Sequence, residues 1–247
     1  MGVVYSVNFL NNSRNSGNAC LFQTEASSPP DAYPVMWFAK SAPPSMPVKF
    51  QWTVDHSFVW GNAGKVVPGI IFKATQFAAA DPARSNEITL ARDASGAVSF
   101  TNQQAAVPAG TFSIRQESTI PANTLAVGLG MSGSPITVVS AQPNAVSAFT
   151  QGAPEYWITF GSYFSGEVLD PRYLTNDPRI VFPVNVYSMT AILNADGSWT
   201  IQPTSQVDAA FAEDGARMPI ASEEAPAAGN DGGHPAPAQR PPWGEVR

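Results

Sequence analysis

Apolar and polar residues alternate along most of the chain. Between positions 48 and 54, the apolar side chains of Val48, Phe50 and Trp52 are separated by the polar Lys49 and Gln51. Residues two apart face the same side of an extended strand, so this alternation predicts half-buried β-strands. The same pattern recurs at 3–9, 87–92, 96–101, 111–116, 156–161, 187–193 and 198–202.

Turn signals separate these segments. Gly96 in RDASGAV and Gly197 in NADGSW stand where a hairpin turn needs a residue in the left-handed conformation. The 23 prolines cluster between the apolar runs, as strand boundaries require. Strands at this spacing, joined by short turns, predict an all-β fold, namely an antiparallel β-sandwich of the jelly-roll or immunoglobulin-like kind.

The C-terminal region has a different composition. Residues 205–218 can form a helix of about two turns that closes at Gly215. From Ala221 onward Pro, Ala, Gly and acidic residues dominate, and such a segment buries too little apolar surface to offset chain entropy. We therefore predict one β-sandwich domain at 1–205, a short helix or linker at 206–220 and a disordered tail at 221–247.

Composition and charge exclude several classes of function. Charged residues make up 13% of the 247 residues, and the net charge is −6. A nucleic-acid-binding protein needs clustered Lys and Arg against phosphate, and the sequence has no such cluster, so we expect no nucleic-acid partner. The single cysteine, Cys20, allows neither an intrachain disulfide nor a cysteine-based metal site, and we interpret it as a small buried residue.

We expect neither a secretory signal peptide nor a transmembrane helix. No basic residues precede the first apolar run, as they would in a secretory signal. No stretch approaches the roughly 18 consecutive apolar residues of a transmembrane helix. We expect a cytoplasmic protein, or one exported without a cleaved signal peptide, with no transmembrane segment.

A polar stretch, NNSRNSGNA at 11–19, interrupts two apolar runs near the N-terminus. It is either a working loop or only the bend between two strands. Asn, Ser and Gly bond to their own backbone and tolerate tight turns. We interpret the stretch as a loop that joins two strands.

Nucleophilic chemistry has one candidate, His56, which lies between Asp55 and Ser57. Neighbours on a strand point to opposite faces, and a catalytic triad is defined by spatial roles rather than adjacency. We therefore assign no catalytic residue.

Carboxylates gather in EVLDPRYLTNDPR at 167–179, which contains Asp-Pro-Arg twice. Glu167, Asp170, Asn176 and Asp177 have the oxygen ligands that Ca²⁺ prefers, and paired carboxylates also serve acid–base catalysis. In the structural interpretation, Asp before Pro begins a turn and pairs locally with Arg. The spacing matches no known metal motif, and we predict no metal and no cofactor.

A glycine-rich hairpin is predicted at 124–139. Leu125, Val127 and Leu129 fall on one face of the first arm, whereas Gly128 and Gly130 fall on the other. The hairpin is either a core element whose glycine face admits another backbone closely, or the membrane-inserting hairpin of a pore former. The short arms favour the first interpretation.

Three segments of the chain resemble one known family. They are YSVNFLNNSRNSGNACLFQT, VMWFAKSAPPSMPVKFQWTVDHSFVW and LAVGLGMSGSPITVVSAQPN, and the similarity covers roughly 3–201. Together they resemble the rhizosphere-induced protein RhiA family. The resemblance implies expression under quorum-sensing control around plant roots, and it implies no catalytic motif. The tail is unmatched.

The leading hypothesis is a non-enzymatic β-sandwich protein that acts as a binding or structural module between bacteria and a host or neighbours. We expect a carbohydrate ligand or a protein partner on the loops around 163–173, where aromatic side chains can stack on sugars, and we also expect self-association through open sheet edges. The alternatives are a hydrolase that uses Asp170, Asp177 or Glu167, and a pore-forming toxin that uses 124–139. The candidate ligand-binding residues are Tyr163, Phe164, Asp170, Arg172, Tyr173, Asp177 and Arg179.

Overall fold

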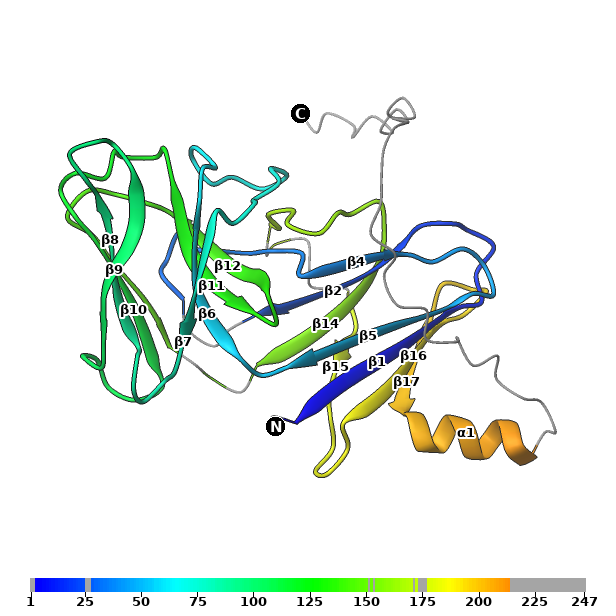
Figure 1. The fold of residues 1–247 in the computed structure, drawn as a ribbon. Coiled ribbons are helices and arrows are strands. Elements are labelled where there is room, and N and C mark those ends of the chain that lie inside the picture. Colours follow the sequence, from blue (N-terminus) through cyan, green and yellow to red (C-terminus); the bar gives the residue numbers. More distant parts are fainter. Residues whose placement is uncertain are drawn as a thin grey trace.

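The computed structural model describes residues 3–24, 28–150, 152, 154–170, 172 and 177–213 (Figure 1). Within them the alternating segments form strands, as predicted, and the fold is all-β. The strands form four sheets, which pack as two sandwiches side by side.

The first sandwich contains both ends of the described chain. One of its sheets has the order β17 (Trp199–Pro203), β16 (Ser188–Leu193), β1 (Val4–Asn11) and β5 (Pro47–Thr53). The facing sheet has the order β15 (Arg179–Ile180), β14 (Glu155–Gly161), β2 (Asn18–Thr24) and β4 (Phe38–Ser41). Aromatic pairs join the two sheets, because the ring centroids of Phe9 and Phe160 are 5.9 Å apart and those of Trp52 and Tyr156 are 5.0 Å apart.

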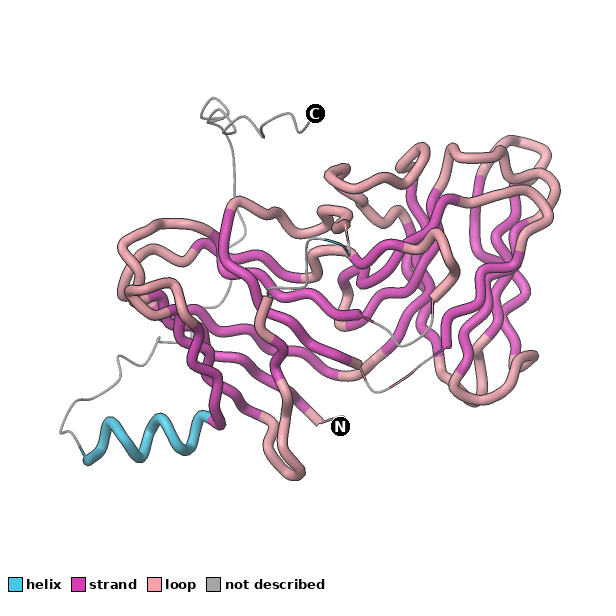
Figure 2. Tube along the Cα trace, turned by 180° about the vertical axis from the view of Figure 1, so that it is seen from behind, coloured by secondary structure: helices cyan, strands magenta, loops and turns pink. Residues whose placement is uncertain are grey.

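The second sandwich is formed by the middle of the chain. Its larger sheet has the order β3 (Tyr33–Pro34), β12 (Ser134–Ser140), β11 (Ala126–Met131), β6 (His56–Gly61) and β7 (Gln76–Ala80). The other sheet has the order β13 (Val146–Thr150), β10 (Thr111–Gln116), β8 (Glu87–Arg92) and β9 (Val98–Gln104). Phe58 and Phe112 meet between these sheets with centroids 5.9 Å apart, and Figure 2 shows the same two groups of strands from behind.

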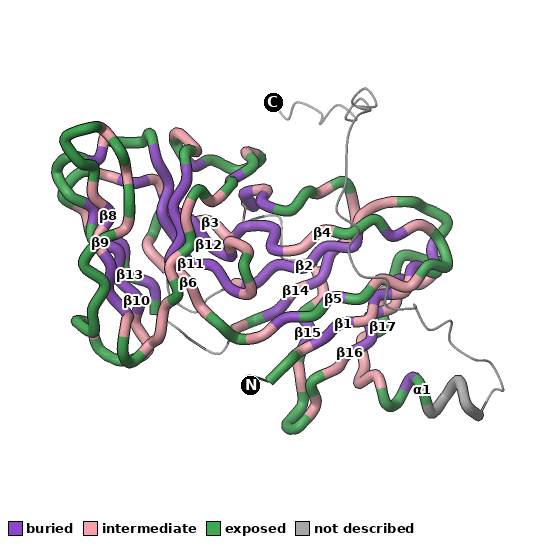
Figure 3. The backbone as a smooth tube through the Cα atoms, in the orientation of Figure 1, coloured by how far each residue is buried: buried purple, intermediate pink, exposed green. Residues whose placement is uncertain are grey.

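One hydrophobic core runs through both sandwiches, and the buried segments in Figure 3 follow it from one to the other. Trp37 lies at the junction. Its ring centroid is 5.3 Å from that of Trp52 in the first sandwich, and its Nε1 donates a hydrogen bond of 2.9 Å to the carbonyl oxygen of Met131 in the second. Burial of these large rings removes much apolar surface from water, which is the main stabilising term.

Two strand pairs differ from the predicted antiparallel arrangement. β1 pairs in parallel with β16, and β8 pairs in parallel with β10. The first of these pairs brings the beginning and the end of the domain side by side, a long-range pairing that alternation within one strand does not reveal.

The helix prediction is confirmed, because α1 spans Thr204–Glu213 directly after β17. No helix within the described ranges is long and apolar enough to cross a membrane. The predicted tail at 221–247 lies outside the described residues, and the division of the chain at 205 and 220 stays a prediction.

The hairpin predicted at 124–139 lies in the centre of a sheet. β11 has β12 on one side and β6 on the other, and all of its residues are buried. A Cβ at Gly128 would collide with the carbonyl oxygen of Thr137, so this glycine face accommodates the neighbouring strand. The exposed edge leucines that a pore-forming hairpin would need are not found here, since Leu125 and Leu129 are both buried.

Candidate functional site

A pocket of about 580 Å³ opens at the end of the first sandwich where β1, β14 and β16 finish. We call it the loop-end pocket. It is formed where the loop between β1 and β2 meets the turn between β16 and β17, at the right of Figure 1. Its lining residues are Ser13, Arg14, Asn15, Thr159, Phe160, Asp177, Leu193, Ala195, Asp196, Gly197 and Trp199.

The loop wall of the pocket is organised by one buried side chain. Asn11 is fully buried, and its Nδ2 donates hydrogen bonds of 2.8 Å to the carbonyl oxygens of Asn15 and Ala42. Its Oδ1 accepts hydrogen bonds from the backbone N–H and the hydroxyl of Ser13, at 3.0 and 2.6 Å. A buried amide whose donors and acceptor are all paired fixes the loop. The polar stretch is thus both a bend between strands and a wall of the pocket.

Two aromatic side chains line the pocket. They are Phe160 and Trp199, and both pack on the buried ring of Phe9, with centroid distances of 5.9 and 5.7 Å. Gly17 makes room for this arrangement, because a Cβ there would lie 2.8 Å from Cζ of Phe160. The pocket lining therefore includes apolar ring surface that is held in place by packing on Phe9.

Two carboxylates line the pocket in different environments. Burial raises the pKa of Asp177 above its ordinary value, although a hydrogen bond with Thr159 acts in the opposite direction. Hydrogen bonds from Ser198 lower the pKa of Asp196, whose Oδ1 accepts from the backbone N–H of Ser198 at 2.9 Å and from its hydroxyl at 2.7 Å. Asp196 is thus held by its own turn, whereas Asp177 is a partly desolvated acceptor.

Arg14 supplies the positive charge of the site. Its side chain is exposed on the loop wall, and it forms no ion pair with any described residue. The loop-end pocket therefore combines two aromatic rings with carboxylate, amide, hydroxyl and guanidinium groups. Such a combination suits a small polar ligand that has one less polar face.

Comparison with known proteins identifies the group to which this chain belongs. The RhiA family model matches residues 2–204. The chain belongs to the RhiA family. It is also 28% identical over 205 residues to Protein RhiA from Rhizobium leguminosarum bv. viciae, covering 82% of this chain and 87% of that relative. No solved structure matches the chain significantly.

Of the seven ligand-binding residues predicted in this RhiA-family chain, Asp177 lines the loop-end pocket. Asp170 instead accepts a bidentate pair of hydrogen bonds from Arg172, at 3.0 Å and 2.6 Å. Arg179 pairs with Glu155 at 2.6 Å. The Arg172 contact agrees with the structural interpretation of a local Asp–Arg pair, whereas Arg179 pairs with a carboxylate 24 residues away rather than with Asp177.

The three aromatic predictions fall in different places. Phe164 is 61% exposed. Tyr163 is half-buried against a small cluster that contains Cys20 and Leu169, and its carbonyl oxygen accepts a 2.8 Å hydrogen bond from the Asn18 side chain. Tyr173 lies outside the described residues.

Prediction from the sequence missed the residues at 13–15 and at 195–199. The signals were present as a polar loop and as the NADGSW turn, but both are ordinary strand connections in sequence. Their meeting in space depends on the parallel pairing of β1 with β16, in which Asn11 lies opposite Leu193.

The other candidate chemistry does not assemble in this RhiA-family protein. The ring of His56 packs on Phe112 with centroids 5.1 Å apart, and the hydroxyl of Ser57 is buried without a hydrogen-bond partner among the described residues. Asp55 accepts hydrogen bonds from Thr53 and Ser132 instead. The three adjacent letters Asp-His-Ser therefore do not form a relay.

The metal hypothesis for 167–177 has no support in the described part of the chain, where no group of three or more His, Cys, Asp and Glu side chains could hold an ion. Asn176 lies outside that part. Cys20 is buried as predicted. Burial, together with the negative charges of Glu167 and Asp177, raises the pKa of its thiol to about 12, so the thiol stays protonated at neutral pH.

Proposed function

We propose that this RhiA-family protein is a non-enzymatic carbohydrate-binding protein that takes a saccharide in the loop-end pocket. The observation that carries the proposal is that one pocket is lined by the polar side chains of Arg14, Asn15 and Asp177 and by two aromatic rings, Phe160 and Trp199. A sugar ring has one face of C–H groups, which packs on aromatic rings, and a rim of hydroxyls, which both donate and accept hydrogen bonds.

The size and preorganisation of the site support this proposal. At about 580 Å³ the pocket falls within the range of roughly 300–1,000 Å³ that is typical of small-molecule sites. The Asn11 network holds the loop wall before any ligand arrives, which reduces the entropy lost on binding. Asp177 is the natural acceptor for sugar hydroxyls, because its carboxylate is partly desolvated.

The biological setting that we propose follows from the family. A binding module of this kind would act between the bacterium and a host or neighbouring cells, under quorum-sensing control. We also propose that the protein has a protein partner or self-associates. For its location we propose the cytoplasm, or export without a cleaved signal peptide.

The test is a glycan array followed by titration calorimetry with the strongest hit. We expect Asp177→Asn and Arg14→Gln each to weaken binding by about tenfold or more, because each removes a hydrogen bond involving a charged group. Asp31→Asn is the matched control, since Asp31 is exposed and does not line the pocket. An array without hits, or unchanged affinity in both pocket variants, would contradict the proposal.

A second candidate function, carboxylate-based hydrolysis, is favoured by one observation. Asp177 and Asp196 share the pocket, and their pKa values are displaced in opposite directions. Glycoside hydrolases use two carboxyl groups whose environments displace their pKa values in opposite directions. One variant distinguishes the two candidate functions. If the protein is a hydrolase, the wild type releases reducing sugar from the bound saccharide and Asp177→Asn does not. If it is a binding protein, neither the wild type nor the variant releases any.

A further inference from the structure

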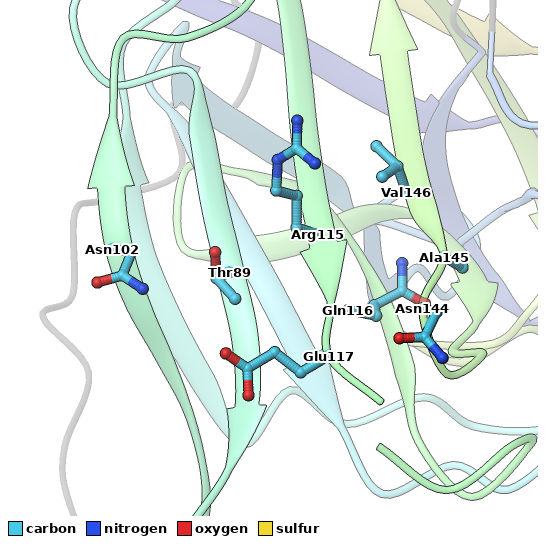
Figure 4. Close-up of a pocket in the computed structure, with 8 residues that line it drawn as sticks. All are labelled: Thr89, Asn102, Arg115, Gln116, Glu117, Asn144, Ala145 and Val146. Atoms are coloured by element: carbon cyan, nitrogen blue, oxygen red, sulfur yellow. The ribbon is translucent and has the colours of Figure 1, made fainter. Parts of the chain in front are cut away.

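A second pocket lies on the outer face of the sheet formed by β9, β8, β10 and β13, at the left of Figure 1 and far from the loop-end pocket. We call it the sheet-face pocket. It has a volume of about 380 Å³. Figure 4 shows its lining residues, which are Thr89, Asn102, Arg115, Gln116, Glu117, Asn144, Ala145 and Val146.

Arg115 is held in position by a buried carboxylate. Its Nε lies 3.0 Å from Oε1 of Glu87, whose side chain is only 2% exposed. The same oxygen accepts a 3.1 Å hydrogen bond from Nε2 of Gln104. Burial opposes the charge on Glu87, but the hydrogen bonds from Arg115 and Gln104 outweigh it and keep the pKa below its ordinary value. Glu87 is therefore ionised at neutral pH and anchors the guanidinium.

The anchored guanidinium keeps free donors. The contact with Glu87 uses Nε, and 56% of the Arg115 side chain remains exposed. The two terminal amino groups of a guanidinium form a planar fork that matches the two oxygens of a carboxylate. Because the carboxylate of Glu87 fixes the stem, little side-chain entropy is left to lose when such a ligand binds.

The remaining lining groups are arranged around this fork. Thr89 faces Arg115 across the β8–β10 pairing, and Val146 faces it across the β10–β13 pairing. In Figure 4 the guanidinium of Arg115 and the carboxylate of Glu117 lie at opposite ends of the pocket, with Thr89 between them. The pocket thus has one cationic end, one anionic end and amides at its sides.

We propose that the sheet-face pocket binds an acidic sugar unit independently of the loop-end pocket. The sugar carboxylate pairs with the terminal amino groups of Arg115, and the sugar hydroxyls bond to Thr89, Asn102 and Asn144. Glu117 accepts a hydroxyl at the far end of the pocket and repels a second carboxylate. Since the protein as a whole carries a net charge of −6, this arrangement favours an isolated acidic unit over a polyanion.

The probe is methyl β-D-glucuronide, and methyl β-D-glucoside is the matched ligand without the carboxylate. Amide chemical shifts of the labelled full-length protein are followed during titration. We expect the glucuronide to bind at least about tenfold more tightly than the glucoside and to shift amides at 89, 115–117 and 144–146. Equal affinity for the two ligands would overturn the proposal.

Variants locate the effect. Arg115→Lys keeps the charge opposite Glu87 but loses the planar fork, and should weaken glucuronide binding by about tenfold. Arg115→Gln should remove the preference for glucuronide over glucoside. Arg84→Gln should change neither, because Arg84 is exposed and lies outside both pockets.

The Arg115→Lys variant should fold normally, because the lysine still pairs with the buried carboxylate of Glu87. Its binding result therefore cannot be explained by misfolding. If its amide spectrum is native-like and the glucuronide affinity is unchanged, the site assignment is wrong. Loss of all binding in Arg14→Gln with full binding in Arg115→Gln would likewise assign the acidic sugar to the loop-end pocket and overturn the proposal.

Discussion

The β11–β12 hairpin and the loop at 12–17 are opposite in character. The hairpin is apolar and glycine-rich, and every residue of β11 is buried. The loop is polar, and Arg14 and Asn15 are exposed on it. Both stretches could be taken for functional elements in the sequence. The structure places the hairpin in the core and the loop in the wall of a pocket.

The difference lies in how each stretch satisfies the hydrogen-bonding groups of its backbone. β11 is paired on both edges and packed on both faces, so its glycines serve to admit the neighbouring strand. The backbone of the loop bonds to neighbouring segments at its two ends, Asn12 and Gly17, and the buried amide of Asn11 holds the residues between them. A buried polar side chain beside an exposed polar loop is therefore the feature that marks the organised site.

The largest expected effect comes from breaking the hairpin. Gly128→Val should lower the free energy of unfolding by about 3 kcal/mol or more, because a Cβ meets the carbonyl oxygen of Thr137 in a strand that cannot move. Denaturant unfolding monitored by tryptophan fluorescence measures the change. Gly133→Asn in the turn of the same hairpin is the control. The φ angle of Gly133 is +73°, a conformation that Asn tolerates, and a Cβ added there would meet no atom of a non-neighbouring residue within 4 Å. Equal stability of the Val variant and the wild type would contradict the description of the core.

The next effect comes from removing the organiser of the loop. Asn11→Ala should cost about 2 kcal/mol, because the carbonyl oxygen of Ala42 and the hydroxyl of Ser13 lose buried partners. It should also weaken saccharide binding, since the loop wall is no longer fixed. Asn12→Ala is the matched control, because that neighbour is exposed and should change stability by less than about 0.5 kcal/mol. If both variants behaved alike, Asn11 would not be the organising residue.

A smaller effect is expected from pH in the hairpin's sheet. Burial lowers the pKa of His56, although the nearby carboxylate of Asp55 acts in the opposite direction. The unfolded chain therefore takes up the proton first, and stability is lost as the pH falls below about 6.5. Chemical denaturation between about pH 7 and pH 5 should show this loss, and His56→Gln should show less of it. If His56→Gln lost stability more steeply than the wild type as the pH falls, the pKa of His56 would be raised rather than lowered by folding, which contradicts the burial argument.

The smallest expected effect is the pH dependence of stability that comes from Asp177 in the loop-end pocket, and its sign is opposite to that of His56. The pKa of Asp177 is raised in the folded state above its ordinary value of 3.8. The folded chain therefore holds this proton more tightly, and Asp177 contributes stability that appears as the pH falls through its folded-state pKa and is absent at higher pH. Comparing wild type with Asp177→Asn across acidic pH should reveal this gain. A wild type that loses stability relative to the variant on acidification would show that Asp177 is solvated or paired with a cation.

Much of the fold could be predicted from local pattern. Alternation predicted the strands around 50, 90, 114 and 158, and Gly96 and Gly197 do adopt the positive φ expected of them, at 90° and 84°. The helix after 203 was also predictable from composition. These features depend on a few neighbouring residues, which is why the sequence reveals them.

The site was less predictable, because it depends on long-range pairing. The loop at 12–17 and the turn at 194–198 meet only because β1 and β16 run in parallel, and neither strand encodes its partner in its own alternation. The Asp-Pro-Arg segments were more conspicuous in sequence, but Arg172 and Arg179 pair with nearby carboxylates. Asp177 was found because its carboxylate was conspicuous. Arg14 and Trp199 were not, because nothing local marks them as neighbours.

The most direct test of the central claim is a backbone amide titration with the strongest saccharide from the glycan array. Binding in the loop-end pocket predicts shifts at Ser13, Arg14 and Asn15 and at 195–199, with the amides of β11 and β12 unchanged. Shifts confined to other surfaces, or perturbation of the hairpin without the loop, would contradict the account.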